Sequence, residues 1–586
     1  MATAARRPPR PRRGRTVSSR RGLVLTVVVL VILVSAFLRL WGLGRPGKYI
    51  FDEGYYAKDA KAIIHGRLGP KPGLHWEPGD EISWPHAEYG KFLISLGILA
   101  LGDDAFGWRF ASALAGIALI ACVYPLARRL GLSPGWALAA LVLAAADMLG
   151  IAQSRIADLD IFVALWTAVC LLCALRYVQG GHRFVWLLLT GLAGGLALGT
   201  KWSGALALLT AGVVVVLFRR RAARMTREAP ADATPVVNSR DNGSADEGGL
   251  FADRGPVPFW PADRPSVAAR LLAALRAALL PVACLIVLPA ALYVLSYVLY
   301  FVHGHGWSDW VELQRQMVTF NFHLKATHTY ASLSPTWIVV ARPVWYFFEG
   351  KVEYHGIVAM GNPLLWWTSI LALVALPVTA IIERNRALVM PALLVALLYF
   401  PWFAATRTSF LYYMTPVAPF LAILVAAALA RLAGEPPTLP AAASPARASA
   451  DKDAGLSLGS DELESGAARP SEMRGLVCLL VFVLVAVATA LFWYPFGRAV
   501  GYLFYVLPSR SAPALGVAAA TIGVAAAAIG FSMLIVKRRF TPLWRYFAWA
   551  YVGGVVGLAA AFLPIIVDIA IAPERFYHLM WFKSWI

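Results

Sequence analysis

The chain has 586 residues, of which 59% are hydrophobic and 15% are charged, and its mean hydropathy is +0.64. Soluble domains carry about 25% charged residues, so this composition excludes an ordinary soluble protein and indicates a polytopic helical membrane protein. The formal net charge of +20 lies largely in short basic clusters beside apolar segments, which favours cytoplasmic helix ends and contact with anionic lipids over nucleic-acid binding.

The N-terminal segment 1–22 is a basic tail with eight arginines before residue 22. Together with the apolar run that follows, it has the features of a cleavable export signal, paired arginines included. Because the rest of the chain is polytopic, we expect this run to remain in place as the first membrane helix.

Apolar segments near the ~20 residues needed to cross a bilayer recur along the chain. We predict about thirteen transmembrane helices, at 23–41, 108–127, 135–153, 160–178, 184–199, 202–218, 271–301, 364–382, 387–403, 410–431, 475–493, 514–536 and 545–570. With the N-terminus inside, the short basic connectors fall on the cytoplasmic side, as the positive-inside rule requires. The loops 42–107 and 302–363 then face outside.

The first external loop contains two adjacent acids, Asp52 and Glu53, within the stretch FDEGYYAKDA. Adjacent carboxylates at a bilayer surface are costly to desolvate, so they need a cationic partner, water or a function. The apolar segment 91–102 in the same loop is too short to span and fits a helix that lies in the membrane interface.

Composition divides the rest of the chain. Segments rich in Ala, Pro, Ser, Asp and Gly, without apolar periodicity, indicate disordered cytoplasmic linkers. The predicted organisation is a basic tail (1–22), a first transmembrane core with its catalytic loop (23–221), a linker (222–269), a second transmembrane core (270–431), a second linker (432–473) and C-terminal transmembrane helices (474–586).

The histidines and cysteines give weak support for a metal. Half of the ten histidines lie in the loop 302–363, and only His303 and His305 have close spacing. All five cysteines lie within apolar spans, where they read as small packing residues. We therefore expect no metal and no cofactor.

A series of motifs occurs in order along the chain. They are FDEGYYAKDA (51–60), HAEYGKFLI (86–94), FGWRFASALAG (106–116), RIADLDIF (155–162), GLALGTKWSG (195–204), THTYASLSPTWIVVARPVWYF (327–347), GNPLLWW (361–367), TRTSFLYYMTPVAPF (406–420) and WFKSWI (581–586). In this order they resemble the protein O-mannosyltransferases, membrane glycosyltransferases that use a polyprenyl-phosphate sugar. The resemblance covers nearly all of the chain outside the two linkers.

Three departures from the family pattern stand out. His86-Ala87-Glu88 replaces the usual His-Pro-Pro, the loop 302–363 is too short for the β-trefoil domain of eukaryotic members, and residues 494–545 insert an additional helix pair. The chain therefore looks like a bacterial-type enzyme.

The resemblance implies an all-α polytopic membrane protein of type C glycosyltransferase architecture, with external interfacial helices. It implies inverting transfer of mannose from polyprenyl-phosphate-mannose to Ser or Thr hydroxyls of exported proteins. The lipid-linked sugar is a substrate, and the other expected partners are the acceptor protein, membrane lipids and, as a candidate, the export translocon, with no nucleic acid. The enzyme is expected in the plasma membrane, with its N-terminus cytoplasmic and its active site outside.

The resemblance also implies roles for individual residues. Asp52 is the expected general base, and Glu53 positions its surroundings or pairs with a cation such as Arg109. The candidate ligands of the donor phosphate are Arg109, Arg342, Lys91, Arg407 and Lys201. The candidate substrate-binding residues are His86, Tyr56, Asp160 and His328.

Other interpretations stay open at this point. Each cation alone can be a snorkelling anchor, Asp160 can form a local salt bridge with Arg155, and the acid pair can simply favour a helix N-terminus. The same lipid-phosphate-sugar chemistry could act on a lipid or polysaccharide, as in aminoarabinose and arabinose transferases. A secondary transporter would need charges within its helices and broken helices near the midplane, and the predicted spans are mostly free of such charges.

Overall fold

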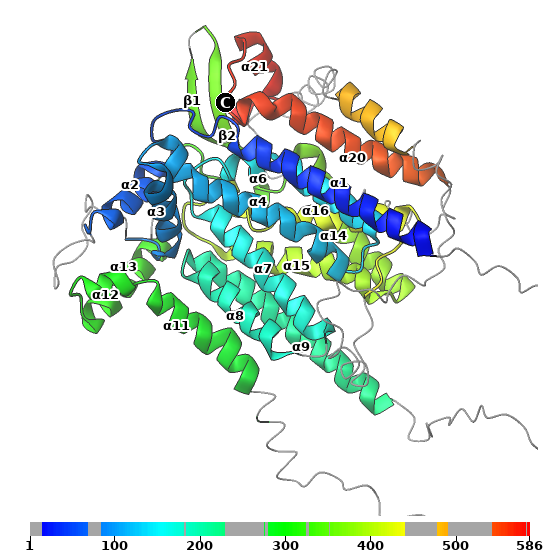
Figure 1. The fold of residues 1–586 in the computed structure, drawn as a ribbon, viewed down its shortest axis with the longest axis horizontal. Helices are drawn as coiled ribbons and strands as arrows, with labels where there is room; N and C mark the ends of the chain where they lie inside the picture. The colour runs from blue at the N-terminus through cyan, green and yellow to red at the C-terminus, as the bar shows by residue number, and fades with distance from the viewer. Residues whose placement is uncertain are drawn as a thin grey trace, which may run out of the picture.

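The computed structural model describes residues 14–67, 84–180, 183–228, 275, 279–323, 327–350, 352–439, 478–489, 542–581 and 583–586. Within these residues the protein is helical except for one two-stranded hairpin. Long helices run side by side through the molecule, and shorter elements gather at one end of them (Figure 1).

Seven helices of the described part are long and apolar enough to cross a membrane. They occupy α1 (Gly14–Leu40, apolar from Gly22), α4 (Ala105–Arg129), α7 (Asp160–Gln179), the run Trp202–Arg219 at the start of α9 (Ala205–Glu228), α14 (Pro363–Glu383), the run Arg386–Ala404 that contains α15 (Val389–Tyr399), and the run Leu543–Ile565 that contains most of α20 (Pro542–Phe562). Shorter apolar helices are α5 (Pro134–Ala145), α8 (Phe184–Leu198), the run Leu279–Leu295 that ends in α11 (Leu288–Leu295), α16 (Ala418–Leu432) and the helix Cys478–Thr489.

Each predicted span except 514–536, which lies outside the described residues, coincides with one of these apolar helices. Several predicted spans were too long; the span 545–570 ends as a helix at Ile565, and the span 271–301 is interrupted after Leu295. The span 135–153 is broken at Asp147, whose side chain accepts a hydrogen bond from the Gly150 N–H and starts the short helix α6 (Met148–Gln153). The span 410–431 begins as an α-helix only at Ala418, after a short 3₁₀ helix at Leu411–Met414. The total of thirteen therefore stays a prediction.

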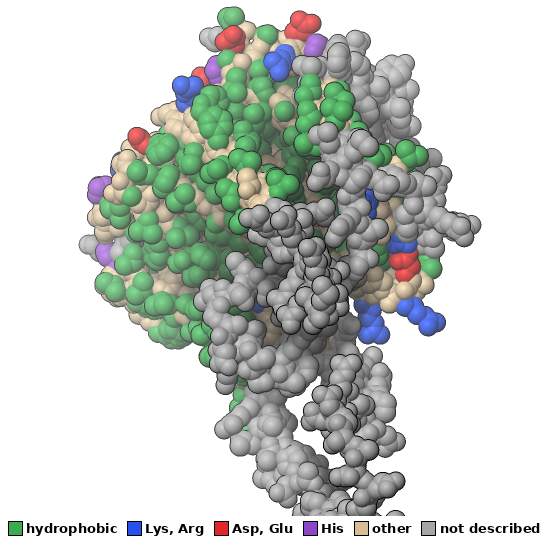
Figure 2. Space-filling model, turned by 45° about the vertical axis from the view of Figure 1, so that its right-hand side comes forward, with side chains coloured by type: hydrophobic (Ala, Val, Ile, Leu, Met, Phe, Trp, Pro, Cys, Tyr) green, Lys and Arg blue, Asp and Glu red, His purple; other side chains and the backbone are tan. Residues whose placement is uncertain are grey.

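Small residues allow the helices to pack closely. Every residue of α16 is buried, and six of its fifteen are alanine, so neighbouring helices can pack closely against it. Helix α7 packs against α4, α8 and α9, while α16 packs against α5 and α14. Figure 2 shows a face on which apolar side chains cover most of the described surface and charged side chains lie at the margins, as expected of a surface in lipid.

The non-spanning elements occupy one end of the bundle (Figure 1). They are α2 (Glu53–Ile64), α3 (Tyr89–Leu101), α12 (Val298–Val302), α13 (Trp307–His323), β1 (Val344–Gly350), β2 (Tyr354–Ala359) and α21 (Pro573–Leu579). The predicted short helix at 91–102 corresponds to α3, which packs on α2 and α4 and exposes Leu96 and Leu99. The hairpin in the loop 302–363 was not predicted.

The hairpin is irregular at one point. Strands β1 and β2 are antiparallel, and the register shifts between Trp345 and Phe347, so Tyr346 is the extra residue of a β-bulge. A bulge turns a side chain out of the regular alternation, and bulges are frequent beside active sites. The hairpin is tied to the C-terminal segment by hydrogen bonds between Tyr354 and Ile571.

Candidate active site

Asp52 lies at the N-cap of α2, but its side chain does not cap the helix. Its Oδ2 instead accepts a hydrogen bond from the Tyr412 hydroxyl at 3.4 Å. The preceding residue, Phe51, has φ +46°, a strained conformation for a side chain of this size. The Phe51 ring packs on Tyr346 at 4.7 Å and on Tyr412 at 5.6 Å between centroids. These contacts hold the strained turn and keep Asp52 directed away from its own helix.

Glu53 has a different environment from its neighbour. It is fully buried, and both of its oxygens bind the Arg109 guanidinium, at 2.6 and 2.8 Å. They also accept hydrogen bonds from the backbone N–H groups of Ile50 and Ala157, both at 3.0 Å. Glu53 therefore fastens the turn before α2 to the segment before α7.

The guanidinium group of Arg109 is fully engaged in hydrogen bonds within the protein. Its remaining hydrogens are donated to backbone carbonyls, those of Leu43, Arg45, Pro46 and Lys48, at 3.0 to 3.1 Å. With all five N–H groups engaged and no exposed surface, Arg109 has nothing left to offer a phosphate. We therefore no longer assign Arg109 to the donor phosphate. Its hydrogen bonds to Glu53 and to loop carbonyls give it a structural role in the first external loop.

Asp160 and Lys201 form a second buried ion pair. The Lys201 Nζ lies 2.7 Å from the Asp160 Oδ2, and both residues are buried. The same ammonium lies over the Tyr413 ring at 4.5 Å. The expected local salt bridge between Arg155 and Asp160 is wrong, because Arg155 donates to backbone carbonyls at the end of α1 and in the turn after it. Asp160 instead belongs to a group of interacting charged side chains, Asp52, Asp158, Asp160 and Lys201, which we call the chamber.

The segment between these pairs contributes an acid that sequence reasoning had not selected. Asp158 is fully buried, and its Oδ1 accepts the N–H of Leu159 at 2.6 Å. Asp52, Asp158 and Asp160 interact electrostatically with one another and with Lys201. Three carboxyl groups thus interact with one ammonium group, and all of these side chains except the partly buried Asp52 are buried.

Burial and the neighbouring charges shift the pKa values of Asp52, Asp158 and Lys201. Burial raises the pKa of Asp52 to about 6, against the opposing effect of Lys201 and with a further contribution from Asp160. Burial, then Asp160 and Asp52, raise the pKa of Asp158 well above its usual range. Burial alone would lower the pKa of Lys201, but Asp160, Tyr413 and Asp158 outweigh it and keep the ammonium charged.

Two other predicted residues, Lys91 and His86, lie among neighbouring side chains. Lys91 is buried and pairs with Asp59 at 3.0 Å, which places it inside the protein rather than at a phosphate. His86 packs against the Tyr56 ring at 6.0 Å between centroids. Burial, followed by the nearby charges of Lys201, Arg407 and Lys91, lowers the pKa of His86 well below its usual range, so it is neutral.

Three predicted residues lie nearer the rim. Arg407 donates to Asn321 of α13 and, at 3.3 Å, to the Tyr413 hydroxyl, so it reaches the ring beneath Lys201. Arg342 is partly buried, and its Nε has no hydrogen-bond partner among the described residues. His328 is exposed, its Nδ1 accepts the Tyr330 N–H at 3.1 Å, and its ring is 5.1 Å from Phe410. Of the predicted phosphate ligands, Lys201 interacts electrostatically with Asp52, and Arg407 contacts Tyr413, the ring over which Lys201 lies.

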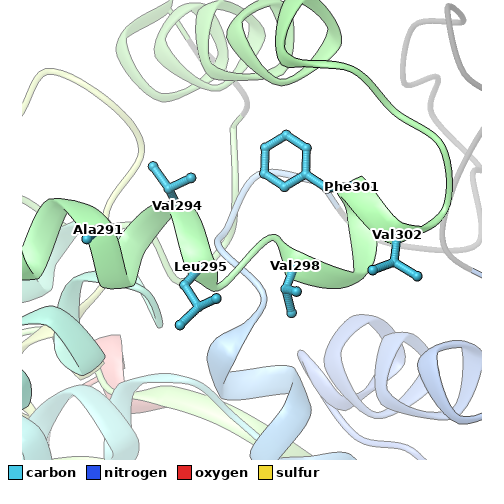
Figure 3. A pocket seen from close by; sticks show the side chains of 6 residues that line it. All are labelled: Ala291, Val294, Leu295, Val298, Phe301 and Val302. Carbon is cyan, nitrogen blue, oxygen red and sulfur yellow. The ribbon is translucent and has the colours of Figure 1, made fainter.

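An apolar groove of 440 Å³ runs along α11 and α12. Figure 3 shows Val294 and Phe301 directed to one side of this groove, and Leu295 and Val298 to the other. Helix α11 is joined to the Lys201 segment, because the Trp202 indole N–H donates to the Tyr293 hydroxyl at 2.7 Å. A larger cavity of 1320 Å³ between α1, α5 and α20 is lined by none of the candidate site residues.

Two family models match the chain. Residues 89–222 match the model described as dolichyl-phosphate-mannose-protein mannosyltransferase. Residues 306–503 match the model of the C-terminal four-transmembrane region of protein O-mannosyltransferase. Together the two models cover more than half of the chain.

Individual proteins agree with the family models. The chain is 24% identical over 467 residues to a polyprenol-phosphate-mannose–protein mannosyltransferase of Corynebacterium glutamicum, covering 70% of this chain and 82% of that protein. It is 32% identical over 178 residues, 29% of its length, to an undecaprenyl phosphate-aminoarabinose arabinosyl transferase of Pseudomonas aeruginosa, of which 31% is covered.

A solved structure confirms the architecture. The protein O-mannosyltransferase Pmt1–Pmt2 complex of S. cerevisiae, bound to its sugar donor, superimposes with a TM-score of 0.58 at 12% identity, covering 96% of this chain and 93% of that one. The expected helical fold of a membrane glycosyltransferase is therefore confirmed.

Proposed function

This chain belongs to the protein O-mannosyltransferase family, and from that premise we propose that it transfers mannose from polyprenyl-phosphate-mannose to Ser or Thr hydroxyls of exported proteins, with inversion at the anomeric carbon. Two family models and the corynebacterial relative support the donor and the protein acceptor. The observation that carries the assignment is Asp52, held on a strained turn in a chamber that contains a buried ammonium group.

Asp52 acts as the general base in this proposal. The acceptor hydroxyl oxygen attacks the anomeric carbon, the bond from that carbon to the phosphate oxygen breaks, and its electron pair stays on the phosphate. The hydroxyl proton passes to the Asp52 carboxylate. With a pKa of about 6, this carboxyl is ionised at neutral pH yet basic enough to take a proton as the hydroxyl becomes acidic.

The phosphate gains negative charge as it leaves, so it needs nearby cations. Lys201 supplies a buried charge next to Asp52, and Arg407, whose guanidinium reaches Tyr413 at the same ring cluster, supplies the second. Asp160 holds Lys201 in place through the 2.7 Å ion pair. We assign the phosphate to Arg407 and Lys201.

The polyprenyl chain needs an apolar surface that leads from the membrane to the phosphate. The groove on α11 and α12 has only apolar lining residues, and α11 contacts the segment that carries Lys201. We place the first isoprene units of the donor there. Charge patterning directs this end of the bundle outside the plasma membrane, where exported chains emerge, and the export translocon remains a candidate partner.

An alternative acceptor is a lipid or polysaccharide, which the partial similarity to the arabinosyl transferase favours. Purified enzyme is incubated with radiolabelled polyprenyl-phosphate-mannose and either a Ser/Thr-rich peptide or lipid acceptors. Label in the peptide supports the proposed function. Label confined to the lipid acceptors would overturn the protein acceptor while leaving the donor chemistry intact.

The base is tested by Asp52→Asn, which keeps the size of the side chain and removes its basicity. A general base contributes roughly 10²- to 10⁴-fold to the rate, so turnover should fall by about that factor while donor binding is largely kept. Near-normal turnover in a correctly folded variant would show that Asp52 is structural.

A further inference from the structure

Two buried oxygen atoms near Asp52 lack hydrogen-bond partners among the described residues. One is the Asp158 Oδ2 and the other is the Tyr346 hydroxyl. Asp158 is 0% exposed and Tyr346 is 4% exposed. A buried polar atom without a partner costs free energy comparable to a lost hydrogen bond, so such atoms are rare in native structures and usually face a ligand or water.

The backbone brings Asp158 beside the base. Glu53 follows Asp52 in the chain, and its carboxylate accepts the N–H of Ala157, the residue before Asp158, at 3.0 Å. Because Glu53 is locked by Arg109, the separation between the two loops is fixed. The Asp158 Oδ1 is held by the Leu159 N–H, which leaves Oδ2 as the atom that can bind a ligand.

Tyr346 approaches the same chamber from the hairpin. It is the extra residue of the β-bulge, and its ring packs on Phe51 and, at 5.9 Å, on Tyr412. Burial, then Asp158 and Asp160, raise the pKa of Tyr346 well above its usual range, so its hydroxyl keeps its proton. The bulged residue thus contacts both Phe51, which precedes Asp52, and Tyr412, whose hydroxyl donates to Asp52.

The two atoms have the chemistry of a sugar site. The Asp158 carboxyl and the Tyr346 hydroxyl can each take part in hydrogen bonds, and a sugar offers neutral hydroxyl groups that both donate and accept them. The cations that suit a phosphate, Lys201 and Arg407, lie on the Tyr413 side of the chamber. Asp158 and Tyr346 therefore remain as hydrogen-bonding groups that the phosphate assignment does not use.

We propose that Asp158, with Tyr346 beside it, forms the subsite that binds hydroxyl groups of the donor sugar. This inference rests on the proposed function, since it takes the ligand to be the glycosyl group of a polyprenyl-phosphate sugar. It assigns Asp158 to recognition of the sugar and leaves the proton transfer to Asp52.

The test compares two ligands, one that carries the sugar and one that lacks it and ends in a phosphomonoester. Affinities for polyprenyl-phosphate-mannose and for polyprenyl phosphate are measured on purified wild-type enzyme, Asp158→Leu, Asp158→Asn and Tyr346→Phe. Removing a buried hydrogen-bonding partner of a substrate hydroxyl should weaken mannosyl-donor binding about 10-fold or more in Asp158→Leu, and about 3- to 10-fold in Tyr346→Phe. Asp158→Asn keeps hydrogen-bonding atoms and should lose less than Asp158→Leu. Affinity for polyprenyl phosphate should change by less than about 2-fold.

Other outcomes overturn the subsite. Equal loss for both ligands would make Asp158 and Tyr346 structural, and unchanged affinity for both would exclude contact with the sugar. If the Asp158 variants bind both ligands normally but lose activity at a different pH on the acid side, Asp158 would act by setting the pKa of Asp52 and not by binding the sugar. If Asp158→Leu fails to fold, Asp158→Asn and Tyr346→Phe still decide, because both retain the packing of the wild type. The binding comparison needs no acceptor, so it is independent of whether the enzyme modifies proteins or lipids.

Discussion

At the scale of single residues, two adjacent acids have opposite roles. Asp52 and Glu53 are neighbours in the chain, yet one points into the chamber and the other is enclosed by Arg109. The left-handed turn at Phe51 separates their directions. The sequence alone shows that two carboxylates need partners, but not that only one of them is available to a substrate.

The pH dependence of the reaction should follow Asp52. Burial raises the pKa of its carboxyl to about 6, and a base must be ionised to accept a proton. The value of kcat/KM should therefore be constant above about pH 7 and fall roughly tenfold per unit below pH 6. The measurement is the rate of mannose transfer at saturating acceptor across the pH range, with donor binding measured at each pH. A rate that stays constant down to pH 4.5 would contradict Asp52 as the base.

Breaking the Glu53–Arg109 pair should destabilise the fold rather than weaken donor binding directly. Removing one partner of a buried ion pair leaves an uncompensated charge and costs about 3–5 kcal/mol. Arg109→Ala should thus lower the thermal unfolding temperature strongly. The matched control is Lys48→Ala, which removes an exposed ion pair with Glu349 and should cost about 1 kcal/mol or less. An Arg109→Ala enzyme of normal stability with weakened donor binding would restore the phosphate assignment.

At the scale of elements, glycine sets the distance between the short helix α3 and the spanning helix α4. A Cβ on Gly97 would lie 2.4 Å from the Gly107 carbonyl oxygen, so no larger residue fits without a shift of backbone. Helix α3 carries Lys91, the buried partner of Asp59 on α2. The contact between α3 and α4 therefore determines where α2, and with it Asp52, is held.

Gly97→Ala should force α3 away from α4. Overpacking of this kind costs about 1–3 kcal/mol, and activity should fall with it because α2 moves too. The control is Gly212→Ala on α9, where nothing lies within 4 Å of the added Cβ, and which should be neutral or slightly stabilising. Thermal unfolding and mannose transfer are measured for both variants. Equal behaviour of the two would contradict the close contact.

At the scale of the whole molecule, we expect the chamber to face outside. Basic clusters mark the opposite ends of the helices, and positive charge is retained in the cytoplasm. Reporter fusions at residues 70 and 330 should report the external side, and fusions at 240 and 450 the cytoplasm. If 70 and 240 report the same side, the order of the first six spans is wrong and the base could not meet an exported acceptor.

Much of the fold could be predicted because hydrophobicity and charge are local properties of the chain. Apolar length located the spans within a few residues, except where Asp147 interrupts a helix and where the residues before Ala418 form turns. The ordered motifs identified the family and led to Asp52. The hairpin was missed because its strands lie in an aromatic-rich loop without clear alternation, and no local signal marks the bulge at Tyr346.

The sequence by itself determined a helical membrane glycosyltransferase and the stretch that carries its proposed base, because these depend on composition and on motifs read along the chain. Only the tertiary structure decided which charges meet. Asp160 pairs with Lys201, 41 residues away, rather than with its neighbour Arg155, and Glu53 takes Arg109, 56 residues away, out of the list of phosphate ligands. The physical reason is that a buried charge binds the partner that packing brings within hydrogen-bond distance, and packing joins helices that are distant in sequence.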